Sequence, residues 1–161
     1  MHIPSSGASG VILAQGGRFG GWSLWLQEDG RPRFTYNWLG RERYDIVATG
    51  PVPSGDRTIR FAFAYDGGRP GAGGLGRISV DGAHVAEGRI GRTQPNVFSA
   101  DEGADVGEDL ATPVSEEYPV PASFTGTIHQ VTIEVQPIAV ADRTAVQESA
   151  SLGRERLAEF E

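Results

Sequence analysis

The chain has 161 residues, which fits one domain of ordinary size and is long enough to bury a stable core without disulfide or metal staples. It has no cysteine, so disulfides, thiolate zinc sites and cysteine nucleophiles are excluded, and all of its basic charge is arginine. A formal net charge of −7 without a basic stripe argues against nucleic acid and anionic membrane surfaces as partners.

The amino-terminal segment does not have the pattern expected of a signal peptide. Residues 1–9 lack the basic start and apolar core of a signal peptide, and no run approaches the ~20 apolar residues that a membrane span needs. We expect residues 1–10 to form a flexible entry segment. The compartment, bacterial cytoplasm or periplasm, stays open.

The first elements are predicted to be short strands. Residues 11–15 form an apolar run that two glycines end, and residues 22–26 and 33–38 alternate apolar and polar side chains with a period of two. Asp29 and Gly30 between the last two runs are a hairpin turn signal, because glycine supplies positive φ at little cost. The sequence therefore predicts a hairpin over 22–38.

A weaker strand is predicted over 43–48, where two nearby prolines then break the pattern. Residues 58–65 form the strongest strand pattern of the first half. One of its two faces is aromatic and aliphatic, and we expect it to point into the core: Ile59, Phe61, Phe63 and Tyr65.

The glycine-rich stretch 66–76 contains a G-x-G-x-x-G pattern at 71–76. A dinucleotide site requires a helix after this pattern, with its amino terminus facing the pyrophosphate. A strand pattern follows instead at 77–80, and the turn Asp81-Gly82 returns the chain to a partner strand over 84–90. We therefore interpret 66–76 as a long hairpin loop.

The longest stretch without a helix or strand pattern is 98–119, which carries seven of the 21 acidic residues. A loop of this length inside a compact domain is either functional or a sign that its elements have been assigned wrongly, and we interpret it as a binding or interface element. Residues 124–135 are rich in β-branched side chains and predict a long final strand. The stretch 142–161 is a marginal helix or a frayed tail.

Many short alternating strands separated by glycine turns predict an all-β fold. We expect a two-sheet antiparallel jelly-roll sandwich over 11–136, with 137–161 as a tail or short C-terminal helix. Clean alternation within the strands indicates that each sheet has one face toward water.

The residues predict no catalytic apparatus. The three histidines lie far apart in the sequence without metal-type spacing, and no G-x-S-x-G elbow is present. The carboxylate pairs at 108–109 and 116–117 are adjacent in sequence, so their side chains diverge, whereas glycosidase carboxylates face each other across a cleft.

A calcium site is the metal hypothesis for the acidic loop. Asp101, Glu102, Asp105, Glu108 and Asp109 offer hard oxygen ligands, and two glycines among them allow sharp turns. From this group we select Asp101, Asp105, Glu108 and Asp109 as candidate ligands. The alternative is a solvated acidic loop or one paired with arginines.

A carbohydrate or protein surface is the binding hypothesis. An exposed tryptophan on a wet sheet face would serve as a sugar-stacking platform or interface anchor, although most tryptophans in small β domains are core residues. Arginines near the first hairpin could clamp an anion or pair with the acidic loop. The candidate binding or interface residues are Arg18, Trp25, Trp38, Arg43, Glu116 and Glu117.

Several motifs occur in an order that resembles the C-terminal region of large bacterial arylsulfatases. The resemblance spans residues 11–135 and rests on eight segments: GGRFGGWSL (16–24), FTYN (34–37), RY (43–44), FAFAYDGG (61–68), GRI (88–90), FSADE (98–102), DVGED (105–109) and TPV (112–114). In those enzymes, the corresponding region resembles a concanavalin-like or laminin-G-like β-sandwich that follows an α/β catalytic domain. The resemblance implies the same type of sandwich for this chain.

The chemistry of those enzymes does not carry over. A sulfatase of this type needs a C/S-x-P-x-R segment, whose cysteine or serine becomes formylglycine, and this chain has neither a cysteine nor a serine in that context. The resemblance therefore implies a non-catalytic accessory domain that packs against a sulfatase catalytic domain or another protein partner. The alternatives are a lectin-like, glycan-binding module and an oligomerisation or stability domain.

Overall fold

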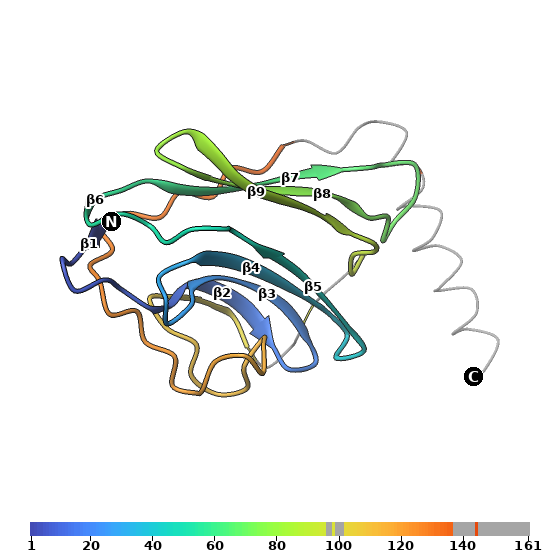
Figure 1. Ribbon diagram of the computed structural model, residues 1–161. Coiled ribbons are helices and arrows are strands. Elements are labelled where there is room, and N and C mark those ends of the chain that lie inside the picture. The colour runs from blue at the N-terminus through green and yellow to red at the C-terminus, as the bar shows by residue number, and fades with distance from the viewer. Residues whose placement is uncertain (96–97, 99–101, 137–143, 145–161) are drawn as a thin grey trace.

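The computed structural model describes residues 1–95, 98, 102–136 and 144 (Figure 1). The chain is all-β, and its strands form three antiparallel sheets of five, three and two strands. The predicted all-β class is confirmed, and the two larger sheets are compatible with a sandwich. The described part of the chain contains no helix with the length and apolar character needed to cross a membrane.

The five-stranded sheet has the order β10-β2-β3-β4-β5. Its strands are β2 (Gly10–Gly17), β3 (Gly20–Leu26), β4 (Pro32–Trp38), β5 (Glu42–Val47) and β10 (Ala104–Val106). The predicted hairpin is β3 and β4, whose register pairs Trp25 with Arg33. Gly30 has a φ of 79° in the connecting turn, which is the conformation that favours glycine there. β10 lies inside the stretch expected to have no strand.

The three-stranded sheet has the order β7-β8-β9, with β7 (Ile59–Tyr65), β8 (Gly74–Val80) and β9 (Ala83–Ile90). The predicted glycine-rich hairpin loop connects β7 to β8. Asp81 and Gly82 both have positive φ, 49° and 82°, as a two-residue type I′ turn between β8 and β9 requires. β8 begins at Gly74, so a strand and not a helix follows the glycines.

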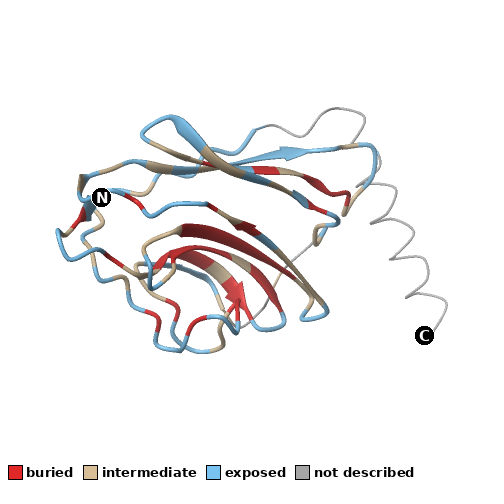
Figure 2. Cartoon of the chain, in the orientation of Figure 1, coloured by how far each residue is buried: buried red, intermediate tan, exposed pale blue. Residues whose placement is uncertain are grey.

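The core lies between the two larger sheets (Figure 2). The rings of Phe34 on β4 and Phe61 on β7 stack with centroids 3.5 Å apart, and Ile46 on β5 is 2% exposed. The side chain of Ile46 packs against Gly76 and Gly88, where a Cβ atom would overlap it. These two glycines let the sheets approach closely at this point.

The amino-terminal segment contains a strand. β1 (His2–Ile3) pairs with β6 (Gly55–Asp56), and Ile3 is 1% exposed. The backbone of His2 also exchanges two hydrogen bonds with Thr127, of 2.7 and 3.0 Å. Residues 1–3 are therefore held between two other segments.

The prediction of a long final strand over 124–135 is wrong. Only single bridges occur in this region, His2 with Thr127 and Val11 with Ser123, and residues 128–136 belong to no sheet. The physical reason is the lack of a neighbour among the described residues, since β1 is two residues long and begins at His2, the residue that pairs with Thr127. The predicted tail 137–161 lies outside the described residues apart from Thr144.

Candidate functional site

The acidic loop forms a third layer on the outer face of the five-stranded sheet. In Figure 1, residues 107–123 run beneath β2, β3 and β4, on the side away from β7, β8 and β9. A second apolar core joins the loop to the sheet, and its buried members are Val11, Ala14, Trp25, Val114, Tyr118 and Ala122. The outer face expected to be wet is thus covered.

A buried carboxylate fastens the centre of this loop. Asp109 is 3% exposed, and its Oδ2 accepts hydrogen bonds from the Tyr118 hydroxyl at 2.6 Å and from the Val114 amide at 3.1 Å. The Tyr118 oxygen also lies 3.2 Å from the hydroxyl of Ser23 on β3. Burial raises the pKa of Asp109 above its ordinary value, against the two hydrogen bonds, which lower it.

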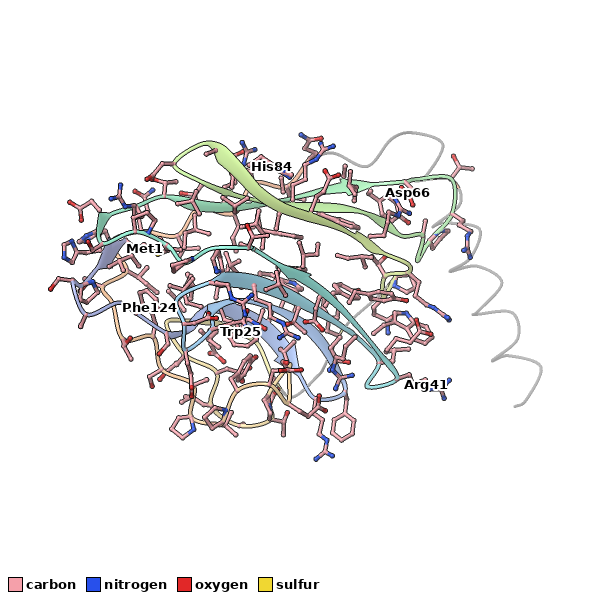
Figure 3. All side chains as sticks on the ribbon, in the orientation of Figure 1. Met1, Trp25, Arg41, Asp66, His84 and Phe124 are labelled. Carbon is pink, nitrogen blue, oxygen red and sulfur yellow. The ribbon has the colours of Figure 1, made fainter. Side chains whose placement is uncertain are left out.

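A polar network borders this cluster around Trp25 (Figure 3). The indole Nε1 of Trp25 donates to the hydroxyl of Thr35, whose own hydroxyl donates to Asp45 at 2.6 Å. The Arg33 guanidinium lies 5.3 Å from the centre of the Trp25 ring, 3.0 Å from Asp45 and 3.5 Å from Glu117. Because Arg33 bridges a sheet carboxylate and a loop carboxylate, it joins the two layers.

Two further sets of contacts hold the loop, one within the loop and one to the scaffold. Glu102 accepts hydrogen bonds from the amide and the hydroxyl of Thr112, at 3.0 and 2.7 Å. Arg43 on β5 pairs with Glu116 at 2.9 Å. Of the two alternatives for the arginines near the first hairpin, anion binding or pairing with the acidic loop, Arg43 shows the second.

The candidate calcium ligands do not converge on one point in the described structure. Asp109 points into the apolar core, Asp105 pairs with Ala14 in the β10–β2 ladder, and Asp101 lies outside the described residues. Within the ranges described, no three acidic or histidine side chains are grouped as a metal ion would require. Calcium binding stays a prediction.

The candidate binding residues fall into separate environments. Trp25 is 4% exposed, and the Arg92 guanidinium lies 4.3 Å from the centre of the half-buried Trp38 ring. Arg18 is exposed at the β2–β3 turn, where its backbone carbonyl accepts a hydrogen bond from the buried Asn37 amide. Trp25 and Arg43 contact loop residues, Tyr118 and Glu116 respectively, and Arg18 reaches the loop through its backbone amide, whereas Trp38 contacts Arg92.

Sequence reasoning missed Tyr118 and Arg33, the two side chains that connect most of this site. The available signal was the composition of the outward positions on β2 and β3, where Ala14, Ser23 and Trp25 carry no charge. An uncharged strand face is typical of a covered surface, and it pointed to a third layer.

A cleft of about 470 Å³ opens beside the loop, next to the β3–β4 turn. It is bordered by Trp25, Gln27 and Tyr118, with Glu28 and Glu117 at its walls. The Oε1 atom of Gln27 is buried and has no hydrogen-bond partner among the described residues. The lining of the cleft thus combines aromatic rings with polar and acidic side chains.

The close approach of the loop to β2 depends on Gly17. A Cβ atom there would overlap the Glu102 carboxylate and the backbone oxygen of Thr112. We expect Gly17→Ala to lower the free energy of unfolding by about 1–3 kcal/mol, because the methyl group displaces backbone as well as a side chain. Gly50→Ala is the matched control, since no atom lies within 4 Å of that position.

The two variants are compared by urea denaturation and by the rate at which an endopeptidase specific for glutamate, of which the loop has four, cleaves the folded protein. Gly17→Ala should expose the loop to cleavage, while Gly50→Ala should behave as the parent. Equal stability and equal cleavage of the two variants would contradict the proposed tight contact at Gly17.

Comparisons of the chain with protein-family models, with curated proteins and with solved structures gave no match.

Proposed function

We propose that this chain is a non-catalytic accessory domain that packs against a catalytic domain of the arylsulfatase class. The ordered motifs of the sequence supply the class, and a concanavalin-like jelly roll is the fold that goes with it. The domain supports and borders a partner, and the bond-breaking groups belong to that partner.

The observation that supports this proposal is how the carboxylates of the acidic loop are bonded. Asp109, Glu116 and Glu117 each bond to a side chain or amide of the scaffold or of the loop itself. A catalytic carboxylate must have reacting atoms within reach. These three carboxylates instead form hydrogen bonds and ion pairs that hold the loop in place. A stiffly held acidic rim suits a surface that shapes the mouth of a neighbouring active site.

Exposed apolar side chains beside this rim support packing against a partner. Phe19 at the β2–β3 turn is 72% exposed, and Leu110 on the loop is 50% exposed. The amide of Arg18 contacts the Thr112 hydroxyl at 3.4 Å, which places the turn and the loop side by side. Large apolar side chains next to an arginine are typical of interface anchors.

Glycan binding is the second candidate function, and the cleft beside Trp25 favours it. Its lining combines the rings of Trp25 and Tyr118 with the side chains of Gln27 and Glu117, and amide and carboxylate groups can hydrogen-bond to sugar hydroxyls. Trp25 and the ring of Trp38 are both covered in the folded chain, so neither presents a free stacking face. The accessory function therefore has the stronger support.

The test has two arms on the purified chain. Hydrolysis of an aryl sulfate is expected to equal that of buffer alone, and turnover well above buffer would overturn the proposal. The second arm mixes the chain with an arylsulfatase catalytic domain that lacks its own C-terminal β region. We expect a 1:1 complex in sedimentation, which Phe19→Asp should weaken at least tenfold.

Calorimetric titration with a sulfated disaccharide separates the two candidate functions. Binding that Gln27→Ala abolishes, together with no complex in sedimentation, would assign the chain to the glycan-binding class and reject the accessory function.

A further inference from the structure

The outer edge of β7 presents backbone groups without a partner strand. The amide of Asp81 donates to the carbonyl of Thr58, and the amide of Asp66 donates to the carbonyl of Gly73. Alternate residues of an antiparallel strand point their backbone groups to opposite sides, so even-numbered residues face β8. The N–H and C=O groups that face away from β8 belong to Ile59, Phe61, Phe63 and Tyr65.

Arg57, just before β7, confirms this alternation. Its amide donates to the Met1 carbonyl at 2.8 Å, and its own carbonyl accepts from the Met1 amino group at 3.0 Å. The odd-numbered side of this segment is thus strand-paired at Arg57. From Ile59 onward, the described residues place no strand against it.

A second unpaired segment lies across from β7. His2 pairs with Asp56 on one side and with Thr127 on the other, both antiparallel. After Thr127, residues 128–136 make no backbone hydrogen bond to another described residue. β7 and 128–136 therefore leave the two sides of β1 in the same direction, as the orange and green traces of Figure 1 show.

The spacing of these two segments is set by β1 at the end where β6, which precedes β7, and Thr127 pair with it. Neighbouring strands lie about 4.8 Å apart, so two segments that flank a single strand are about 9–10 Å apart. β1 fills this space only at residues 1–3, at the end where Figure 3 labels Met1. We name the remaining space, between β7 and residues 128–136, the strand slot.

We propose that the strand slot binds one extended segment of a partner polypeptide, which lies antiparallel to β7 and continues the line of β1. The segment spans about eight residues, opposite 58–65. It hydrogen-bonds to β7 through one edge and to 128–136 through the other, in the manner of β-strand addition.

The alternation of β1 sets the side chains that the slot prefers. Met1 packs against the core, Ile3 is buried, and His2 points outward to an ion pair with Asp56. Residues of the partner that lie opposite Ile59 and the following odd-numbered positions will therefore point inward and be apolar. The residues between them will face water and be polar.

The two walls of the strand slot, β7 and residues 128–136, carry exposed apolar side chains, which agrees with the absence of a neighbouring strand among the described residues. Phe63 and Tyr65 on β7 are 37% and 42% exposed, and Ile133 and Val135 are 60% and 86% exposed. The β7 strand of a second copy does not fit the slot, because it already has β8 along one edge. Only a strand with two free edges pairs with both walls.

This inference rests on the backbone geometry and does not depend on the proposed function. The probe is a synthetic eight-residue peptide in which valine and isoleucine alternate with threonine and arginine. The control peptide has the same side chains but carries N-methyl groups on alternate amides, which removes the hydrogen bonds along one edge. Amide hydrogen exchange of the full chain is followed by NMR, residue by residue.

We expect the peptide to slow exchange at Ile59, Phe61, Phe63 and Tyr65 at least tenfold. Exchange at Arg60, Ala62 and Ala64 should be slow already and unchanged, because these amides face β8. The methylated peptide should have no effect. If the four odd-numbered amides are already slow in the free protein, another segment or copy fills the slot and the proposal is wrong.

Fusing the same eight residues directly ahead of Met1 removes weak affinity as an explanation for failure, because the strand is then held at high effective concentration. Fast exchange at the four amides in this fusion would overturn the strand slot altogether. Protection by the fused strand alone, with none from the free peptide, would assign the slot to a strand of the same polypeptide and reject a separate partner.

Discussion

Trp25→Ala is expected to lower the free energy of unfolding by about 3–5 kcal/mol, as removal of a buried aromatic side chain usually does. Trp25 is 4% exposed and packs edge-on against Tyr118 with ring centres 4.9 Å apart. Truncation leaves a cavity between the sheet and the loop and removes the donor to Thr35. The loop layer should therefore detach before the sandwich core unfolds.

Detachment of the loop before the core unfolds can be measured by proteolysis. Limited proteolysis of Trp25→Ala under native conditions should cut within 107–123 much faster than in the parent protein. Trp38→Ala is the control, because Trp38 is half-buried against the sandwich core and contacts Arg92 but not the loop. It should cost about 1–2 kcal/mol and leave loop cleavage unchanged. Equal loop cleavage in the two variants would refute the anchoring role of Trp25.

The local features of the fold were predictable because they depend on neighbouring residues. The β3–β4 hairpin follows from alternation around Asp29-Gly30, and the β8–β9 turn follows from Asp81-Gly82. A dinucleotide site at 71–76 could be rejected from the sequence alone, because a strand pattern follows it where such a site needs a helix. In each case, a short stretch of sequence carries the whole physical cause.

The uncharged outward face of β2 and β3 indicated a covering layer but not the segment that forms it, because that depends on contacts across long sequence separations, such as Tyr118 with Ser23. Asp109 was considered as a metal ligand, because the residue types around it do not show that the Tyr118 hydroxyl and the Val114 amide donate to it. The prediction of a final strand over 124–135 was wrong for a related reason. Residues 128–136 have the composition of a strand, but a strand also needs a neighbour, and β1 supplies one only at Thr127.

Asp109→Ala is expected to destabilise the protein by about 2–3 kcal/mol, whereas Asp109→Asn is expected to be neutral or stabilising at pH 7. The alanine variant leaves the buried Val114 amide without an acceptor and removes the main partner of the Tyr118 hydroxyl. The asparagine variant keeps an oxygen acceptor for both donors. It also removes the cost of a buried negative charge, which the nearby Glu102 and Asp105 increase.

The pH dependence of stability tests the charge directly. Burial raises the pKa of Asp109 in the folded protein above the ordinary value of 3.8. Below pH 3.8 the carboxyl group is protonated in both states. As the pH rises through 3.8, the unfolded chain releases this proton while the folded protein keeps it, so the free energy of unfolding falls. Once the pH passes the raised folded pKa, this contribution becomes constant.

Asp66 and Asp81 contribute with the opposite sign. The Arg89 side chain lowers the pKa of Asp66, and the Thr58 amide lowers that of Asp81, so their contributions are lost as the pH falls. Both residues are the same in the parent and in Asp109→Asn, so they cancel in the difference between the two proteins. Urea denaturation from pH 3 to 7 should show this difference growing in favour of the variant as the pH rises above 3.8. A difference that stays flat would mean that Asp109 is not a buried charge, and that it holds the loop no more strongly than a neutral amide would.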